Sequence, residues 1–272
     1  MNEVAYTVFC GRAGDPNDLA MPGSKAIGEA LARQSGISPV IIGTPEPALN
    51  SSWQEELDAA MSGLRAMQHR FEEVFRSEAI SVAATGRCVV SLSTLPVVAK
   101  YHPDICVVWF DAHADLNTPE VSASGYLGGM ALAGPLGLWD PGLGSGLKPE
   151  QIVLVGQRDI DPSESLLIAR HNITCIKPGE GLAERLQQAI AGRALYVHLD
   201  CDVLEPGIVP TDYVIDGGLT LAELKECCEV IATQRFVGIE IAEFQHRWKG
   251  QEEAASPVPL LEALSPILKR EG

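Results

Sequence analysis

The stretch Val107–Asp115, which reads VVWFDAHAD, constrains this chain more than any other part of it. Its first four residues are apolar and predict a buried parallel strand, and Asp111, His113 and Asp115 follow it with a spacing of two residues. In open α/β sheets, ligands bind beyond the carboxyl ends of the strands. Three metal-capable side chains at such a point therefore predict a binding site at the edge of a sheet.

A second stretch has the same organisation, because Leu195–Leu199 is apolar apart from His198 and is followed by Asp200 and Asp202. We expect His198 to be a hydrogen-bonded core residue behind the site. Carboxylates with one imidazole suit divalent ions of the manganese type, and two such ions can activate water for hydrolysis. Either acidic cluster alone could equally be a solvated turn or a helix cap. Two clusters at the ends of apolar strands favour a binuclear metal centre.

Apolar runs alternate with amphipathic segments along almost the whole chain, which predicts a three-layer α/β fold. We expect a single domain over residues 1–272, because this length is ordinary for one α/β domain. Strands are expected at Ala5–Cys10, Val40–Ile42, Cys88–Leu92, Cys106–Phe110, Gln151–Val155, Thr174–Ile176, Leu195–Leu199 and Phe236–Ile241. Helices are expected after a cap at Ser24, from Pro162, and over Ser52–Arg76, Thr94–Lys100, Leu182–Ile190, Leu221–Ala232 and Pro259–Leu268.

Composition limits the partners and the compartment. The formal net charge of −16 disfavours nucleic acid and anionic membrane surfaces, and it favours the approach of a cationic small molecule. Apolar residues make up 46% and charged residues 21%, which is typical of globular rather than membrane proteins. Seven cysteines at irregular positions and no secretory segment at the start predict a reducing compartment, so we expect a cytoplasmic protein.

Between about Cys88 and Glu243 the chain resembles the arginase or ureohydrolase family in six ordered motifs, DAHADLNTP, SASGYLGGM, GQRDIDPSE, LDCDVLEP, GGLT and IEIAEF. These motifs are long enough to be jointly specific. The resemblance implies an α/β fold with a central, mostly parallel eight-stranded sheet and two manganese ions at the strand ends. It also implies a guanidino amino acid as substrate and a homo-oligomer, since family members are commonly trimeric or hexameric.

The resemblance also implies a role for each matching residue. The metal ligands would be Cys88, Asp111, His113, Asp115, Asp200 and Asp202. Asp111 and Asp200 would bridge the two ions, Asp115 would also orient the attacking hydroxide, and Glu243 would pair with the substrate guanidinium. The α-carboxylate and the α-amino group of the substrate would be held by Asn117, Ser122 and Ser124 and by Asp161, respectively. Contacts for both groups favour an arginine-like substrate over a decarboxylated one.

Two positions depart from the pattern of the family. Cys88 stands where the family has a histidine ligand, and a thiolate is softer than manganese prefers, so we expect weak occupancy of one ion site. The alternative for Cys88 is an ordinary buried core thiol. Gly128 stands where arginases have a histidine that relays a proton to the leaving group, so no imidazole is available there.

Within the family, the segments CVVSLSTLPVVAKYHPD, NTPE, GYLGGM and DVLEPG are most similar to the branch that hydrolyses Nω-hydroxy-L-arginine in D-cycloserine biosynthesis. That branch also has cysteine at the ligand position, and it yields L-ornithine and hydroxyurea. The leading hypothesis is therefore a metal-dependent amidinohydrolase of this kind. The alternatives are a hydrolase of arginine or of another guanidino or formimino acid, and a non-catalytic member that binds an amino acid or one metal ion.

Overall fold

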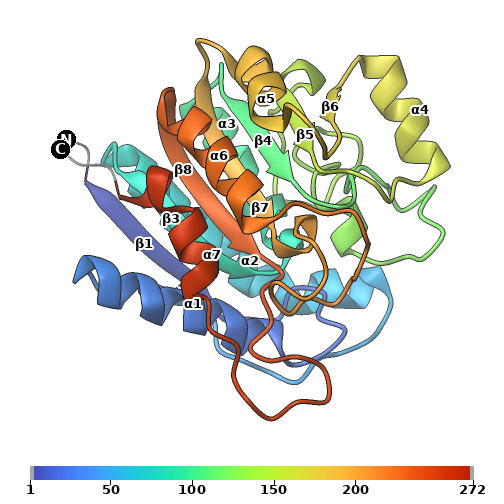
Figure 1. Cartoon of the computed structure of the whole chain (residues 1–272). Coiled ribbons are helices and arrows are strands. Elements are labelled where there is room, and N and C mark those ends of the chain that lie inside the picture. The colour runs from blue at the N-terminus through green and yellow to red at the C-terminus, as the bar shows by residue number, and fades with distance from the viewer. Residues whose placement is uncertain (1–2, 270–272) are drawn as a thin grey trace.

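One sheet of eight parallel strands runs through residues 3–269, the part of the chain that the computed structural model describes. The strands are β1 Val4–Phe9, β2 Val40–Ile42, β3 Ile80–Gly86, β4 Cys106–Phe110, β5 Ile152–Val155, β6 Thr174–Ile176, β7 Ala194–Asp200 and β8 Arg235–Ala242. Their order in the sheet is β2, β1, β3, β8, β7, β4, β5, β6 (Figure 1). The expected central sheet is confirmed, and it is parallel throughout.

Helices cover both faces of this sheet and give the three layers that the sequence predicts (Figure 1). They are α1 Ala20–Ser35, α2 Trp53–Arg76, α3 Ser91–Tyr101, α4 Pro162–His171, α5 Leu182–Ile190, α6 Leu221–Ala232, α7 Val258–Ala263 and α8 Ser265–Leu268. Helices α1, α5, α6, α7 and α8 pack in the core on one face, and α2 and α3 pack in the core on the other. No helix within residues 3–269 is long and apolar enough to cross a membrane.

The central strand β4 contributes to both cores. Val107 and Trp109 pack in the core under α2 and α3, and the other three residues of the strand pack in the opposite core. Every residue of β4 is fully buried, as the alternation of side chains requires in a strand that is covered on both faces. Polar residues can begin only where the strand leaves the two layers, and this point is Asp111.

Helix α2 forms as the sequence predicts. The Ser52 hydroxyl accepts the backbone N–H of Glu55, and the Glu55 carboxylate accepts the backbone N–H of Ser52, which completes a capping box. Leu64, Met67 and Phe71 recur at helical spacing and are fully buried. Met67 therefore belongs to the core and not to a binding surface.

The expected strand over Cys88–Leu92 is wrong, because Cys88–Val90 is a 3-10 turn that leads into α3. The strand lies earlier, at β3, whose sequence ISVAATG is less apolar than CVVSL, so local hydrophobicity favours the wrong segment. β3 pairs with β1 and β8, and its Ala83 and Ala84 are fully buried toward opposite cores. Tertiary pairing therefore decides this strand, and it places Cys88 just beyond the end of the strand.

Two expected helix boundaries are also wrong. Ser24 lies inside α1 rather than at its N-cap, and its hydroxyl donates to the Phe9 carbonyl at 2.6 Å, which ties the helix to the end of β1. The expected C-terminal helix over Pro259–Leu268 is divided at Leu264 into α7 and α8. Pro266 explains the break, because proline has no N–H to continue the helical hydrogen bonds.

The four strands in the middle of the sheet, β3, β8, β7 and β4, are neighbours in that order. Every residue expected to bind metal, and also Glu243, lies at or just beyond the carboxyl end of one of these strands. Parallel strands end at the same edge, so the topology gathers residues that are up to 155 positions apart in the chain.

Candidate active site

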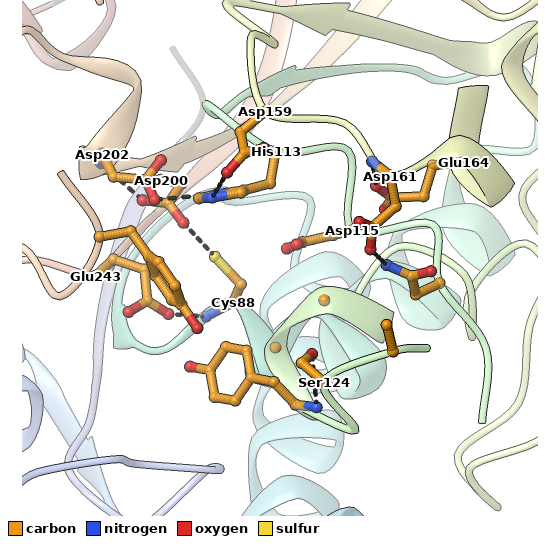
Figure 2. A pocket seen from close by; sticks show the side chains of 16 residues that line it. Cys88, His113, Asp115, Ser124, Asp159, Asp161, Glu164, Asp200, Asp202 and Glu243 are labelled. Atoms are coloured by element: carbon orange, nitrogen blue, oxygen red, sulfur yellow. Dashed lines mark hydrogen bonds and ion pairs between the residues drawn. The ribbon is translucent and has the colours of Figure 1, made fainter. Parts of the chain in front are cut away.

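Five of the six residues expected to bind metal line one cavity of about 230 Å³ (Figure 2), and the sixth, Asp111, is grouped with them by its ligand atoms. Their ligand atoms form groups in which all atoms lie within 4.8 Å of one another. These groups are Cys88 with Asp111 and Asp115, Cys88 with Asp200 and Glu243, and Asp111 with His113 and Asp202. Asp111 and Cys88 each belong to two of the groups, whereas Asp200 belongs to one, together with Cys88 and Glu243.

His113 lies between two carboxylates. Its Nδ1 atom is 3.2 Å from Oδ1 of Asp111 and 3.2 Å from Oδ2 of Asp202. Trp109 Nε1 donates to the other oxygen of Asp111 at 2.9 Å, and the backbone N–H of Ala112 donates to the other oxygen of Asp202 at 3.1 Å. One oxygen of each carboxylate is therefore held by a neighbouring N–H group, and the other lies against the imidazole of His113.

Cys88 is 2% exposed, and its thiol lies 3.0 Å from Oδ2 of Asp200 and 3.2 Å from Nε2 of His198. On the other side of the imidazole, Nδ1 of His198 lies 2.8 Å from Oε1 of Glu240. The ring also stacks on Trp109, with the centroids 3.5 Å apart. The expected buried, hydrogen-bonded state of His198 is confirmed. The chain of thiol, imidazole and carboxylate holds the sulfur toward the cluster of acids.

The buried acids form an environment that favours positive charge. Burial raises the pKa of Asp111, Asp115 and Asp200, and repulsion between neighbouring carboxylates raises it further. Burial lowers the pKa of His113, but hydrogen bonds to Asp111 and Asp202 raise it overall. The pKa values of the three aspartates and of His113 are all raised, which means that added protons or metal cations stabilise this cluster. Four aspartates, an imidazole and a thiol are a donor set that fits divalent cations with a preference for oxygen ligands.

Glu243 is held at the edge of the cavity by other segments of the chain. Its Oε1 accepts the backbone N–H of Cys88 at 2.9 Å, and its Oε2 accepts Nη1 of Arg87 at 2.7 Å. The Arg87 side chain is 1% exposed and also pairs with Asp15 at 2.8 Å and with Asp212. Glu243 is expected to bind the substrate guanidinium. In this structure its carboxylate already forms an ion pair with the guanidinium of Arg87.

Asp115 and Glu243 share an unusual backbone conformation, with φ of 52° and 62° in the left-handed region. Hydrogen bonds hold both residues there. The Asp115 carbonyl accepts the N–H groups of Leu132 and Ala133, and the Glu243 N–H donates to the Gly86 carbonyl at 2.9 Å. Strain of this kind is common at functional sites, and two of the five non-glycine residues with positive φ among residues 3–269 are the two expected to be catalytic.

Residues expected to hold the amino-acid end of the substrate lie across the cavity from Glu243. Figure 2 shows Asp161 and Glu164 on that far side, with Asp115 between them and Glu243. Asn117 Nδ2 donates to Oδ2 of Asp161 at 2.8 Å, and the Glu164 carboxylate accepts the Asp161 N–H at 2.9 Å. The fold therefore brings Asn117 and Asp161 together at the start of α4.

The two expected serines lie differently. Ser124 lines the cavity, whereas Ser122 does not, and the Ser122 hydroxyl instead accepts the backbone N–H of Gly125 at 3.0 Å. Gly128 also lines the cavity without a side chain. The ring of Tyr126 occupies the space that a side chain at 128 would need, since a Cβ atom there would lie 2.3 Å from Cε1 of the tyrosine.

Several side chains of this site are absent from the residues predicted from sequence, among them Glu240, Arg87 and Tyr126. The signal for Glu240 is a carboxylate inside the otherwise apolar segment IEIA, where it is fully buried. Arg87 and Tyr126 have no comparable local signal. Their importance comes from partners that are distant in sequence, such as Asp212 and Glu243.

The chain also matches known sequences over most of its length. The model that describes the Arginase family matches residues 20–255 of the chain. The chain is 38% identical over 256 residues to the N(omega)-hydroxy-L-arginine amidinohydrolase of Streptomyces lavendulae, with 94% of each chain covered. It is 30% identical over 227 residues to an arginase of Glaciozyma antarctica, which covers 75% of this chain and 65% of that one.

Solved structures share the fold. The arginase of Bacillus subtilis superposes with a TM-score of 0.84 at 20% identity, over 99% of both chains. The Entamoeba histolytica arginase in complex with L-ornithine superposes with a TM-score of 0.85 at 22% identity, over 98% of this chain and 99% of that one. At such identities the likeness establishes the three-layer architecture alone.

Proposed function

Because this chain belongs to the arginase family, and is thus a ureohydrolase, we propose that it hydrolyses Nω-hydroxy-L-arginine to L-ornithine and hydroxyurea. The observation that carries the proposal is the 38% identity, over 94% of both chains, to a relative named for this amidinohydrolase activity. Two local features support it: a thiol at Cys88 among the candidate metal ligands, and the absence of a side chain at Gly128.

The cofactor in this proposal is a pair of manganese ions. Asp111 and Asp200 would be shared by both ions, Cys88 and Asp115 would complete one ligand set, and His113 would complete the other with Asp202. When bound, the two cations supply an activated water molecule and stabilise the negative charge of the transition state. The soft thiol makes the ion beside Cys88 the more weakly held one.

The chain's own residues would position the substrate along the cavity. Glu243 would accept hydrogen bonds from the guanidino group, and Asp161 would accept them from the α-amino group. Asn117 and Ser124 would hold the α-carboxylate, with Ser122 supporting the loop behind them. Asp115, between the two ends, would orient the attacking water and accept its proton.

The pair of Glu243 and Arg87 supports an N-hydroxylated substrate over arginine. A guanidinium that binds Glu243 shares this carboxylate with Arg87, and although Asp15 and Asp212 also neutralise Arg87, repulsion between the two cations offsets part of the attraction to Glu243. An Nω-hydroxyguanidine is less basic, so it can bind there in its neutral form. The contact with Glu243 then remains while the repulsion is removed.

The test is ornithine release from Nω-hydroxy-L-arginine and from L-arginine, measured side by side after manganese loading and again after chelation. We expect a higher kcat/KM for the hydroxylated substrate and loss of turnover with chelator. Guanidinobutyrate and a formimino amino acid complete the panel.

A higher kcat/KM for L-arginine would contradict the proposed substrate and leave an arginase. Turnover that survives chelation would contradict the metal centre. No turnover of any substrate after verified metal loading would indicate a member that binds without catalysis.

A further inference from the structure

The cavity has no imidazole at Gly128, and a phenol fills the vacant space. A Cβ atom at residue 128 would lie 2.3 Å from Cε1, 2.8 Å from Cζ and 3.0 Å from Oη of Tyr126. With the ring in this conformation, there is no room for a side chain at residue 128. The position of the Tyr126 ring therefore depends on the absence of a side chain at residue 128.

The Tyr126 hydroxyl lies at the end of the cavity where the guanidino group is proposed to bind. Glu243, Arg87 and the Cys88 thiol are near enough to interact with it electrostatically, and Figure 2 shows Asp161 across the cavity from Glu243. Tyr126 makes no side-chain hydrogen bond within residues 3–269, so its hydroxyl is available to a ligand. The backbone is fixed, because the Tyr126 N–H donates to Ser124 Oγ at 3.2 Å.

We propose that Tyr126 is a catalytic residue that donates the proton to the departing amine, in the place that Gly128 leaves open. This inference rests on the proposed hydrolysis of a guanidino amino acid. As the bond from the guanidino carbon to the δ-nitrogen breaks, the nitrogen keeps both electrons of that bond and takes the proton of Tyr126 Oη. The phenolate then recovers the proton that the attacking water lost when it added to the carbon.

The chemistry of the two partners is well matched. A phenol and an alkylammonium have ordinary pKa values of about 10 and about 10.4, so the two groups are intrinsically similar in acidity, and the raised pKa of Tyr126 shifts the proton toward the phenol. Burial and the nearby Glu243 carboxylate raise the pKa of Tyr126, which keeps the phenol protonated until the amine departs. An imidazole would instead lose its proton near neutral pH.

Removal of the hydroxyl alone is the first test. Tyr126→Phe keeps the ring that fills the space at Gly128, and we expect kcat to fall by about 10²- to 10⁴-fold with KM within about threefold of its original value. Tyr213→Phe removes the other phenol of the cavity and should lower kcat by less than about tenfold. Tyr101→Phe, at a phenol outside the cavity, should leave kcat unchanged.

An exchange of the two side chains is the second test. Gly128→His alone should impair the enzyme, because the new side chain collides with the ring of Tyr126. In the Tyr126→Ala background, Gly128→His should instead raise kcat by at least about tenfold over Tyr126→Ala. The rescued enzyme should also lose activity above the pKa of histidine, about 6.5, whereas the original enzyme should not. If Tyr126 had a purely structural role, the exchange would not change how activity depends on pH.

Each outcome separates the inference from the proposed function. If the unmodified enzyme prefers L-arginine, the proposed substrate is wrong, and the same variants test Tyr126 with L-arginine. If the enzyme is active and Tyr126→Phe keeps its kcat, or Tyr213→Phe loses as much, the role of Tyr126 is wrong. Metal content and calorimetric binding of L-ornithine are measured for each variant, and a loss of kcat that follows lost metal also counts against the proposal.

Discussion

Cys88 is the residue whose chemistry most distinguishes this metal centre. Its thiol is buried beside Asp200 and is held from behind by His198, whose other nitrogen meets Glu240. Burial raises the pKa of Cys88, and the nearby Asp200 carboxylate raises it further, so the free thiol keeps its proton until a cation arrives. A bound cation reverses this balance and stabilises the thiolate.

Replacement of this thiol should therefore affect one ion more than the other. For Cys88→Ala we expect at least about 100-fold weaker binding of one of two manganese ions, because a direct ligand is lost. The check is metal content after gel filtration, together with the thiolate-to-metal charge-transfer band of the cobalt-loaded protein.

Cys106→Ala is the matched control, since Cys106 is a buried thiol in the core contributed by β4. It should keep both ions and the charge-transfer band. Equal metal content in both variants would show that Cys88 is an ordinary core thiol.

At the scale of the elements, Arg87 joins segments that the sheet alone would not fix. It follows β3, and it pairs with Asp15 before α1, with Asp212 in the loop after β7 and with Glu243 after β8. Tyr213, next to Asp212, packs against His113 with ring centroids 5.1 Å apart. One buried cation therefore sets both the direction of Glu243 and one wall of the cavity.

Loss of this cation should destabilise the protein strongly. For Arg87→Gln we expect the free energy of unfolding to fall by about 3–5 kcal/mol, because buried carboxylates lose their counter-charge. Arg12→Gln is the comparison, since its partner Glu46 is 54% exposed, and it should cost no more than about 1 kcal/mol. Urea unfolding of both variants measures the difference, and similar costs would contradict a structural role for the Arg87 cluster.

At the scale of the whole molecule, the acidic centre links stability to pH and to metal. Asp111, Asp115 and Asp200 have folded-state pKa values above their unfolded values near 4. Acids of this kind stabilise the fold fully below pH about 4, and their contribution is lost as pH rises through the folded pKa values. The raised pKa of His113 also adds stability at low pH that is lost as the pH rises.

The metal-free protein should therefore melt at progressively lower temperature as the pH is raised from about 5 to about 8. Manganese should abolish or reverse this trend, because the bound cations replace the lost protons and stabilise the folded state. Differential scanning calorimetry with and without chelator measures both effects. In the metal-free protein, Asp115→Asn should weaken the dependence of the melting temperature on pH. An unchanged dependence would contradict the conclusion that this acidic cluster causes it.

Periodicity and local chemistry predict most elements of this fold. The apolar run of β4, the capping box of α2 and the bounds of α6 follow from neighbouring residues, and the structure agrees with them. β3 does not follow in this way, because its small residues gain their stability from β1 and β8 on either side. Pro266 indicates a break in the C-terminal helix, but the sequence alone does not show that α7 ends before Leu264 and α8 begins after it.

By itself, the sequence determines the kind of chemistry that this protein can perform. Acids and an imidazole at the ends of apolar strands specify a metal centre, since the strand order of a parallel sheet must place such ends at one edge. Only the tertiary structure decides which groups act together there. The contact of Arg87 with Glu243 and the filling of the space at Gly128 by Tyr126 arise from segments that meet in three dimensions, and no local pattern encodes such distances.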